Sequence, residues 1–368
     1  MEYKQLFLLS FWMVFVTIVV VHISAEQSGT DQHKLIKKVA YKVKAKKMKA
    51  LKRISEDLSY TIYSKELPVG SESYMLDPDE ASLALTWSKT VKKQKKMLKR
   101  QRKRQKRTIF EEDSRSRISS PFHKRMFPFN TAVHVYPACT GTVIGQRYVL
   151  TAAECIHNGD RLLATIDKLR VAMYRQDDDF DPLETDEPWS KAVTWYKINK
   201  VFIPNGWRWK LDPARYNYAV LRVSEGHFNR CMAIEGNANV AMSKRNRIHF
   251  SSFERFHRKD NPILLYRYCY MEKNSMTYIY EQCDSTPEAL GAGIYYRFWK
   301  GEDNIWERKI IAVKSDKRQN VKLNGDKNTK LVGKDLRITP LVFAQICFWV
   351  SNSTTSCGKG TISDICFK

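Results

Sequence analysis

Eight cysteines, all C-terminal to residue 138, are the side chains of this sequence with the clearest chemistry. Thiols oxidise to disulfides outside the cytosol, so the compartment of the protein decides what these residues do. An even count confined to one region predicts four bridges within one folded unit and leaves the preceding chain without cross-links. The cysteines are Cys139, Cys155, Cys231, Cys269, Cys283, Cys347, Cys357 and Cys366.

A second chemical feature is a cluster of seven carboxylates within the eleven residues 177–187. Such a cluster could hold Ca²⁺ or a basic segment of the same chain, but its spacing matches no familiar Ca²⁺ loop. A solvated loop is the default interpretation, and we expect no metal site and no cofactor. The carboxylates are Asp177, Asp178, Asp179, Asp181, Glu184, Asp186 and Glu187.

The N-terminal residues indicate the compartment in which the protein folds. One lysine, Lys4, precedes the almost wholly apolar residues 5–21, and "HISA" then places the small Ala25 at the expected cleavage position. This is the layout of a secretory signal peptide. A signal anchor is the alternative, because the apolar stretch approaches spanning length. We expect cleavage after Ala25, secretion to the extracellular space and no stable membrane span.

Residues 26–107 differ from the rest of the chain in charge. They hold 23 Lys and Arg against 9 Asp and Glu, a net charge of +14, while residues 108–368 carry +10. Apolar residues recur among the lysines over residues 35–58, which predicts a basic amphipathic helix. Such a helix suits acidic polysaccharide, lipid headgroups or an acidic protein surface, or it is a solvated pro-region helix. Nucleic acid is not the expected partner of a secreted chain.

The basic segment ends in "KKQKKMLKRQRKRQKR", and its last four residues, Arg104 to Arg107, fit the Arg-x-Lys-Arg pattern that furin-type convertases cut. A basic run alone could instead bind heparin or act as a nuclear signal. Behind a signal peptide we expect processing after Arg107, which divides a pro-segment, residues 26–107, from a folded domain, residues 108–368.

The folded domain reads as a series of short strands. Segments rich in β-branched and aromatic residues are separated by Gly, Pro, Asn and Asp, which predicts an all-β antiparallel barrel or sandwich. Near the end, Thr339 can cap and Pro340 can open a helix through "LVFAQICFWV". The expected strands are "TAVHVYP", "GTVIGQRYVLTAA", "KLRVAMYR", "NYAVLRV", "RIHFSSF", "ILLYRYCYM", "TYIYEQC", "GIYYRFW" and "KIIAVKS".

The order of these segments resembles the trypsin-like serine proteases, whose fold is two antiparallel β-barrels packed side by side. The blocks "CTGTVIGQRYVLTAAECIH", "MFPFNTAV", "RIHFS" and "RITPL" are most similar to a secreted subgroup containing serine protease 23 and inactive serine protease 35. The resemblance runs from about Arg104 to Trp349 and excludes the pro-segment. It implies barrels at about 124–235 and 240–350, followed by a C-terminal extension.

The resemblance also implies disulfide pairs. Cys139 and Cys155 flank the motif that holds the family's catalytic histidine, and a bridge joins the family's cysteines there. Cys269 and Cys283 match a bridge of the second barrel. The other four cysteines allow three pairings. Among these we favour Cys347 with Cys357 and Cys231 with Cys366.

All three catalytic positions of the family are replaced in this chain. Trypsin-like catalysis needs a serine nucleophile, a histidine that takes its proton, an aspartate that orients the histidine, and backbone N–H groups for the oxyanion. The resemblance places these side chains at Ala292, Glu154 and Asn217 respectively. Alanine has no nucleophilic atom, a carboxylate is a weak base at neutral pH, and asparagine lacks the orienting charge. We therefore expect no catalytic residues.

The neighbours of Ala292 also depart from the family. Leu290 and Gly291 stand where active members have glycine and the aspartate that pairs with the new N-terminus after activation. Processing at Arg107 should therefore not switch on a protease; removal of a basic tail is the simpler role.

Two residues nearby offer weak substitutes for the missing groups. Asp284-Ser285 imitates the usual nucleophile turn, but no glycine follows Ser285. His157 lies three residues after Glu154, and the subgroup has a histidine there as well as at the catalytic position, so we expect it on the surface. Neither is expected to restore catalysis.

Together these features predict a secreted pseudo-protease that binds or regulates an extracellular protein or an acidic polysaccharide such as a glycosaminoglycan. A furin-type convertase would process it, and Asn352 in Asn-Ser-Thr is a glycosylation acceptor. The alternative is an active serine endopeptidase of the trypsin-like family, which the fold alone would suggest.

Overall fold

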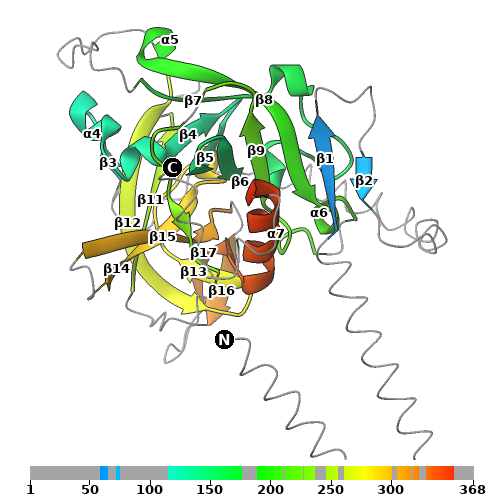
Figure 1. The fold of residues 1–368 in the computed structure, drawn as a ribbon. Helices are drawn as coiled ribbons and strands as arrows, with labels where there is room; N and C mark the ends of the chain where they lie inside the picture. The colour runs from blue at the N-terminus through cyan, green and yellow to red at the C-terminus, as the bar shows by residue number, and fades with distance from the viewer. Residues whose placement is uncertain are drawn as a thin grey trace, which may run out of the picture. The chain divides into compact units, whose positions relative to one another are not determined.

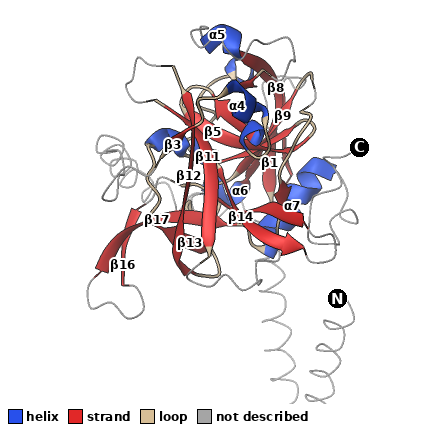
Figure 2. Ribbon diagram, turned by 90° about the vertical axis from the view of Figure 1, so that its left-hand side faces the viewer, coloured by secondary structure: helices blue, strands red, loops and turns tan. Residues whose placement is uncertain are grey.

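Strands make up most of the described chain, as Figure 2 shows in red. The structure is a computed structural model. It describes residues 59–64, 72–74, 115–175, 189–209, 212–226, 228–236, 246–255, 261–300, 305–315, 318–322 and 329–351. All of them belong to one unit, Asp57–Lys368. Within these residues no helix has the length and apolar composition to cross a membrane.

The first barrel is a ring of six antiparallel strands. The strands follow the order β8-β7-β4-β5-β6-β9, and pairing of β9 with β8 closes the ring. Their bounds are β4 Ala132–Val135, β5 Cys139–Gly145, β6 Tyr148–Thr151, β7 Arg170–Tyr174, β8 Val193–Pro204 and β9 Ala219–Val223. Two strands from the N-terminal segment, β1 (Tyr60–Ser64) and β2 (Glu72–Tyr74), extend this sheet beyond β8.

The second barrel closes in the same way. Its ring is β15-β14-β11-β12-β13-β17, and β17 pairs back onto β15. The bounds are β11 Arg247–Glu254, β12 Ile263–Asn274, β13 Tyr278–Glu281, β14 Gly293–Lys300, β15 Ile305–Val313 and β17 Thr329–Arg337. Three strands add to its margins: β3 (Ser116–Arg117), β10 (Ala233–Ile234) and β16 (Arg318–Lys322). The two rings confirm the predicted double-barrel, all-β fold.

Strand β5 explains how the barrels join. All seven of its residues are buried, because apolar side chains such as Val143 fill the first barrel while hydroxyls face the second. The Oγ1 of Thr140 accepts from the N–H of Phe253 at 3.0 Å, and the Oγ1 of Thr142 accepts from the N–H of Gly293 at 2.8 Å. Buried hydroxyls are stable only when bonded, so these contacts set the barrel interface.

The closing helix α7 (Pro340–Ser351) is confirmed. The N–H of Val342 donates to the Oγ1 of Thr339 at 3.2 Å, which caps the helix as predicted. On its buried face, Trp349 stacks on Phe202 of the first barrel with 5.8 Å between ring centroids. Three shorter α-helices lie elsewhere in the described residues: α4 (Pro121–Arg125), α5 (Trp189–Ala192) and α6 (Asn205–Trp209).

Several strands were absent from the predicted set. The longest is β8, in which lysines interrupt the apolar pattern and weaken the strand signal. The other notable one is β1, which lies in the predicted pro-segment and pairs antiparallel with β8 (Figure 1). The predicted boundary at residue 107 concerns processing and stays a prediction. In the structure, the sheet of the first barrel begins at residue 60.

Candidate degenerate active site

The turn after β6 holds Glu154. The strand ends at Thr151, and the short 3₁₀ helix η3 (Ala153–Cys155) follows. A disulfide joins Cys155 to Cys139 on β5, with 5.9 Å between the Cα atoms. The disulfide therefore fixes the turn that carries Glu154 against the neighbouring strand.

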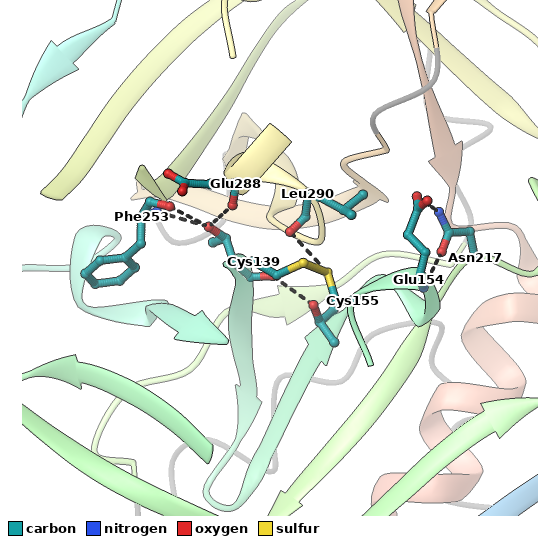
Figure 3. Close-up of a disulfide and its surroundings, with 9 residues drawn as sticks. Cys139, Glu154, Cys155, Asn217, Phe253, Glu288 and Leu290 are labelled. Atoms are coloured by element: carbon teal, nitrogen blue, oxygen red, sulfur yellow. Dashed lines mark hydrogen bonds between the residues drawn. A yellow bond between two sulfur atoms is a disulfide. The ribbon is translucent and has the colours of Figure 1, made fainter. Parts of the chain in front are cut away.

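Glu154 and Asn217 are brought into direct contact. The Glu154 N–H donates to the Oδ1 of Asn217 at 3.0 Å, and the Nδ2 of Asn217 donates to the Oε1 of Glu154 (Figure 3). Asn217 is only 1% exposed. An amide both donates and accepts, so one asparagine meets the backbone and the carboxylate together. The pair holds its geometry, but neither group is a base comparable to a histidine paired with an aspartate.

Ala292 lies on a separate turn, between the 3₁₀ helix η5 (Pro287–Ala289) and β14. Its side chain is fully buried and packs into the core of the second barrel. The turn docks on the first barrel, because the N–H of Thr140 donates to the carbonyl of Leu290 at 2.9 Å. Figure 3 shows this carbonyl facing the Cys139–Cys155 disulfide.

The backbone N–H groups of this turn point inward. The Ala292 N–H donates to the carbonyl of Ala289 at 3.1 Å, and the Leu290 N–H donates to the carbonyl of Pro287 at 3.2 Å. These are the N–H groups at the nucleophile position and two residues before it. An oxyanion hole requires such donors to aim at an empty position where charge develops. Here both are already bonded within the turn.

Gly291 explains why the turn can pack so tightly. Its φ of +89° lies in the left-handed region that favours glycine. A Cβ at this position would lie 2.3 Å from the carbonyl oxygen of Thr140 and 2.3 Å from the Oγ1 of Thr151. Its N–H donates to the carbonyl of Lys314 at 2.9 Å. The turn in this conformation leaves no room for an aspartate side chain.

Comparisons with known proteins show the family of this chain. The Trypsin family pattern matches residues 111–226. Human serine protease 23 is 34% identical over 266 residues, covering 70% of this chain and 68% of that protein. Rat inactive serine protease 35 is 30% identical over 307 residues, covering 73% and 74%. The chain belongs to the trypsin-like serine protease family.

Among solved structures, "Structure of Glu endopeptidase in complex with MPD" aligns at 14% identity with a TM-score of 0.48. The alignment covers 66% of this chain and all of that one. The family assignment rests on the sequence relatives, which include proteins named as proteases and proteins named as inactive.

The expectation that His157 lies on the surface is wrong. The side chain is fully buried. Its Nδ1 accepts from the Gly159 N–H at 2.9 Å, so the other nitrogen, Nε2, carries the proton and donates to the Tyr63 hydroxyl at 2.8 Å. Tyr63 belongs to β1, a strand that the family resemblance did not cover. Both ring nitrogens of His157 are thus committed to structural hydrogen bonds.

Ser285 is also poorly placed to act as a nucleophile. It is 8% exposed, and the preceding Asp284 is 2% exposed. The carbonyl of Asp284 accepts from the Nη1 of Arg267, a fully buried arginine that also pairs with Glu254. The segment is therefore built into an ionic cluster of the second barrel.

Two of the four predicted disulfides are confirmed. Cys139 pairs with Cys155, and Cys269 pairs with Cys283. The carboxylate of Glu281 approaches the second pair, but its sulfurs are bonded to each other and are not metal-binding thiolates. Cys231 and Cys347 are also disulfide-bonded. Their predicted partners, Cys366 and Cys357, lie outside the described residues, so both pairings remain predictions.

Sequence reasoning missed a buried charged group beside the Ala292 turn. The Nζ of Lys314 pairs with Glu281 and lies 3.5 Å from the Oδ1 of Asp335. Burial raises the pKa of Asp335 to about 8, against the lowering effect of Lys314. Burial disfavours the charge of Lys314, but the two carboxylates outweigh it and raise its pKa. The available signal was Glu281 at the end of the otherwise uncharged strand β13 and Lys314 directly after the apolar end of β15.

The remaining predicted sites lie outside the described residues. They are the cleavage positions Ala25 and Arg107, the helix at 35–58, the acidic cluster at 177–187 and the glycosylation acceptor Asn352.

Proposed function

We propose that this chain is a secreted, catalytically inactive member of the trypsin-like family that acts by binding an extracellular partner. The observation that carries the proposal is the state of the nucleophile turn. Ala292 supplies no nucleophile and is buried, and the N–H groups of Leu290 and Ala292 bond within the turn. A site without nucleophile, base or free oxyanion donors cannot carry acyl transfer.

A basic and aromatic face on the second barrel supports an acidic partner. Exposed Tyr268 and Tyr270 alternate along β12, and the guanidinium of Arg247 lies over both rings, 4.6 and 5.5 Å from their centroids. On β14, exposed Arg297 lies 5.2 Å from the ring centroid of Trp306, which is 52% exposed. Guanidinium groups bind sulfates and carboxylates, and aromatic rings stack on sugar rings or peptide groups. We call these residues the Arg–Tyr face.

An active-site probe tests the absence of catalysis. The purified secreted chain is treated with a biotinylated fluorophosphonate, before and after furin treatment, alongside the variant Ser285→Ala. We expect no covalent labelling of any form. Labelling of the furin-treated chain that disappears in Ser285→Ala would show an active serine endopeptidase and overturn the proposal. The relatives named serine protease 23 make this the necessary comparison.

Heparin chromatography tests the acidic partner. The wild-type chain should be retained and should elute with increasing salt, because exposed charges are screened within about 10 Å at 0.1 M salt. The double variant Arg247→Ala/Arg297→Ala should elute earlier than Arg161→Ala, which removes an exposed arginine from a loop of the first barrel. Equal, weak retention of the furin-treated and untreated forms argues against an acidic polysaccharide. N-terminal sequencing of the secreted product identifies both cleavages.

A further inference from the structure

Strand β1 lies on an edge of β8 that would otherwise be open. It pairs antiparallel along five residues, from Tyr60 opposite Pro204 to Ser64 opposite Lys200. The other edge of this part of β8 pairs with β9. An unpaired strand edge exposes backbone N–H and C=O groups that need partners. β1 therefore covers this edge of β8 and extends the sheet of the first barrel (Figure 1).

Side chains fix the position of β1 from inside the sheet. Thr61 is fully buried, and its Oγ1 donates to the Oδ1 of Asn205 at 2.5 Å. The same oxygen accepts from the Nη1 of Arg208 at 2.7 Å. Asn205 is fully buried too, and its N–H donates to the Ser59 carbonyl at 2.9 Å. Removing β1 would take from the buried Asn205 the hydroxyl that bonds its side chain and the carbonyl that accepts its N–H, which is costly.

Two aromatic residues attach β1 to other parts of the domain. The Tyr63 hydroxyl bonds to Nε2 of the buried His157, as described above. The Tyr60 ring meets the Trp349 ring of α7 edge to face, with 5.6 Å between centroids. β1 thus contacts a barrel strand, the turn after Glu154 and the C-terminal helix.

The predicted cut at Arg107 lies between β1 and the remainder of the domain. No cysteine precedes Cys139, so no disulfide can hold the N-terminal fragment. We propose that residues 59–64 stay bound as a strand of the first barrel after cleavage at Arg107, so that the processed protein is a non-covalent complex of its two fragments. The basic segment, with its net charge of +14, then remains part of the mature protein. This inference rests on the predicted cleavage and is independent of the absence of catalysis.

The test uses the full secreted chain cut with furin. The products are passed over a size-exclusion column without denaturant, and the fragments are identified by mass spectrometry. We expect both fragments in one peak, and separate peaks in denaturant. Elution of the N-terminal fragment by itself from the cut wild-type chain would overturn the proposal, as would failure of furin to cut after Arg107.

Matched variants show whether β1 holds the complex. Thr61→Val keeps the side-chain shape but removes the hydroxyl, and we expect the cut fragment to leave at least about tenfold faster than in wild type. Tyr63→Phe should have a smaller effect in the same direction. Ser73→Ala is the control, because among the described strands β2 pairs with β1 alone. Release at the wild-type rate in both β1 variants would show that these contacts do not hold the fragment.

Hydrogen exchange on the uncut chain provides a measurement that does not depend on furin. The amides of residues 60–64 should exchange as slowly as those of residues 200–203 on β8. Fast exchange confined to residues 60–64 would overturn the strand itself.

Discussion

Restoring the three catalytic residue types should not restore proteolysis. The perturbation is the triple variant Glu154→His/Asn217→Asp/Ala292→Ser. The introduced histidine at position 154 and aspartate at position 217 should contact each other, because Glu154 and Asn217 already do. The nucleophile turn is not repaired by these substitutions. The N–H groups of Leu290 and residue 292 remain bonded to the carbonyls of Pro287 and Ala289. The variant would have a catalytic triad but no oxyanion hole to stabilise the transition state.

The expected loss of catalytic rate follows from these two hydrogen bonds. Losing one oxyanion donor lowers kcat by about 10²–10³, which corresponds to about 2.7–4 kcal/mol. Two independent donors therefore account for about 10⁴–10⁶. Opening the turn to free them would disturb the bond from the Thr140 N–H to the Leu290 carbonyl at the barrel interface and the bond from the Gly291 N–H to the Lys314 carbonyl. We expect kcat/KM for a chromogenic ester to fall short of an active serine protease by at least this factor.

The assay is fluorophosphonate labelling with time, combined with ester hydrolysis. The control is the double variant Glu154→His/Asn217→Asp, which retains Ala292 and has no nucleophile. Near-ultraviolet circular dichroism must show that both variants keep native packing, because a hydroxyl added at the buried position 292 costs about 1–3 kcal/mol if it finds no partner. Stoichiometric labelling of a folded triple variant within minutes would refute the closed turn.

Three further outcomes concern stability. Gly291→Ala should lower the free energy of unfolding by about 2–4 kcal/mol, because the strain of a positive φ and the clash of the new Cβ with the backbone both destabilise the folded state. Gly226→Ala, with φ of +82° but a Cβ that meets only the Tyr196 ring, should lose about 1–2 kcal/mol in the same urea titration; equal losses would contradict the clash. Burial raises the folded pKa of Asp335 above its ordinary 3.8, so the native state binds this proton more tightly than the unfolded state does, and the contribution of Asp335 to stability should fall as pH rises above 3.8. Asp335→Asn should remove that slope, at most about 1.4 kcal/mol per pH unit; an unchanged pH profile would show that the group is ionised in the fold. Burial lowers the pKa of His134 to about 4 from 6.5, so the folded state favours the neutral imidazole. Its contribution to the free energy of unfolding should be present above pH 6.5 and lost on acidification towards pH 4. His134→Phe should flatten this loss, and an acid limb as steep as in wild type would contradict it.

Local patterns were sufficient for most of the fold. The alternation of β-branched and aromatic residues located nine strand segments, and Thr339 with Pro340 located the start of α7. The resemblance placed Cys139–Cys155 and Cys269–Cys283 correctly. Strands whose apolar pattern is broken by lysines, β8 above all, were missed because their burial comes from neighbours rather than from composition.

The sequence by itself determined which chemical groups are present at the degenerate site: a carboxylate at 154, an amide at 217 and a methyl group at 292. Only the tertiary structure decided how they are used. It pairs Glu154 with Asn217 across 63 residues and directs the N–H groups of Leu290 and Ala292 into their own turn. It also places β1 beside β8 and buries His157 beneath Tyr63. These outcomes depend on contacts between segments far apart in the chain, where burial and hydrogen-bond satisfaction outweigh local preference.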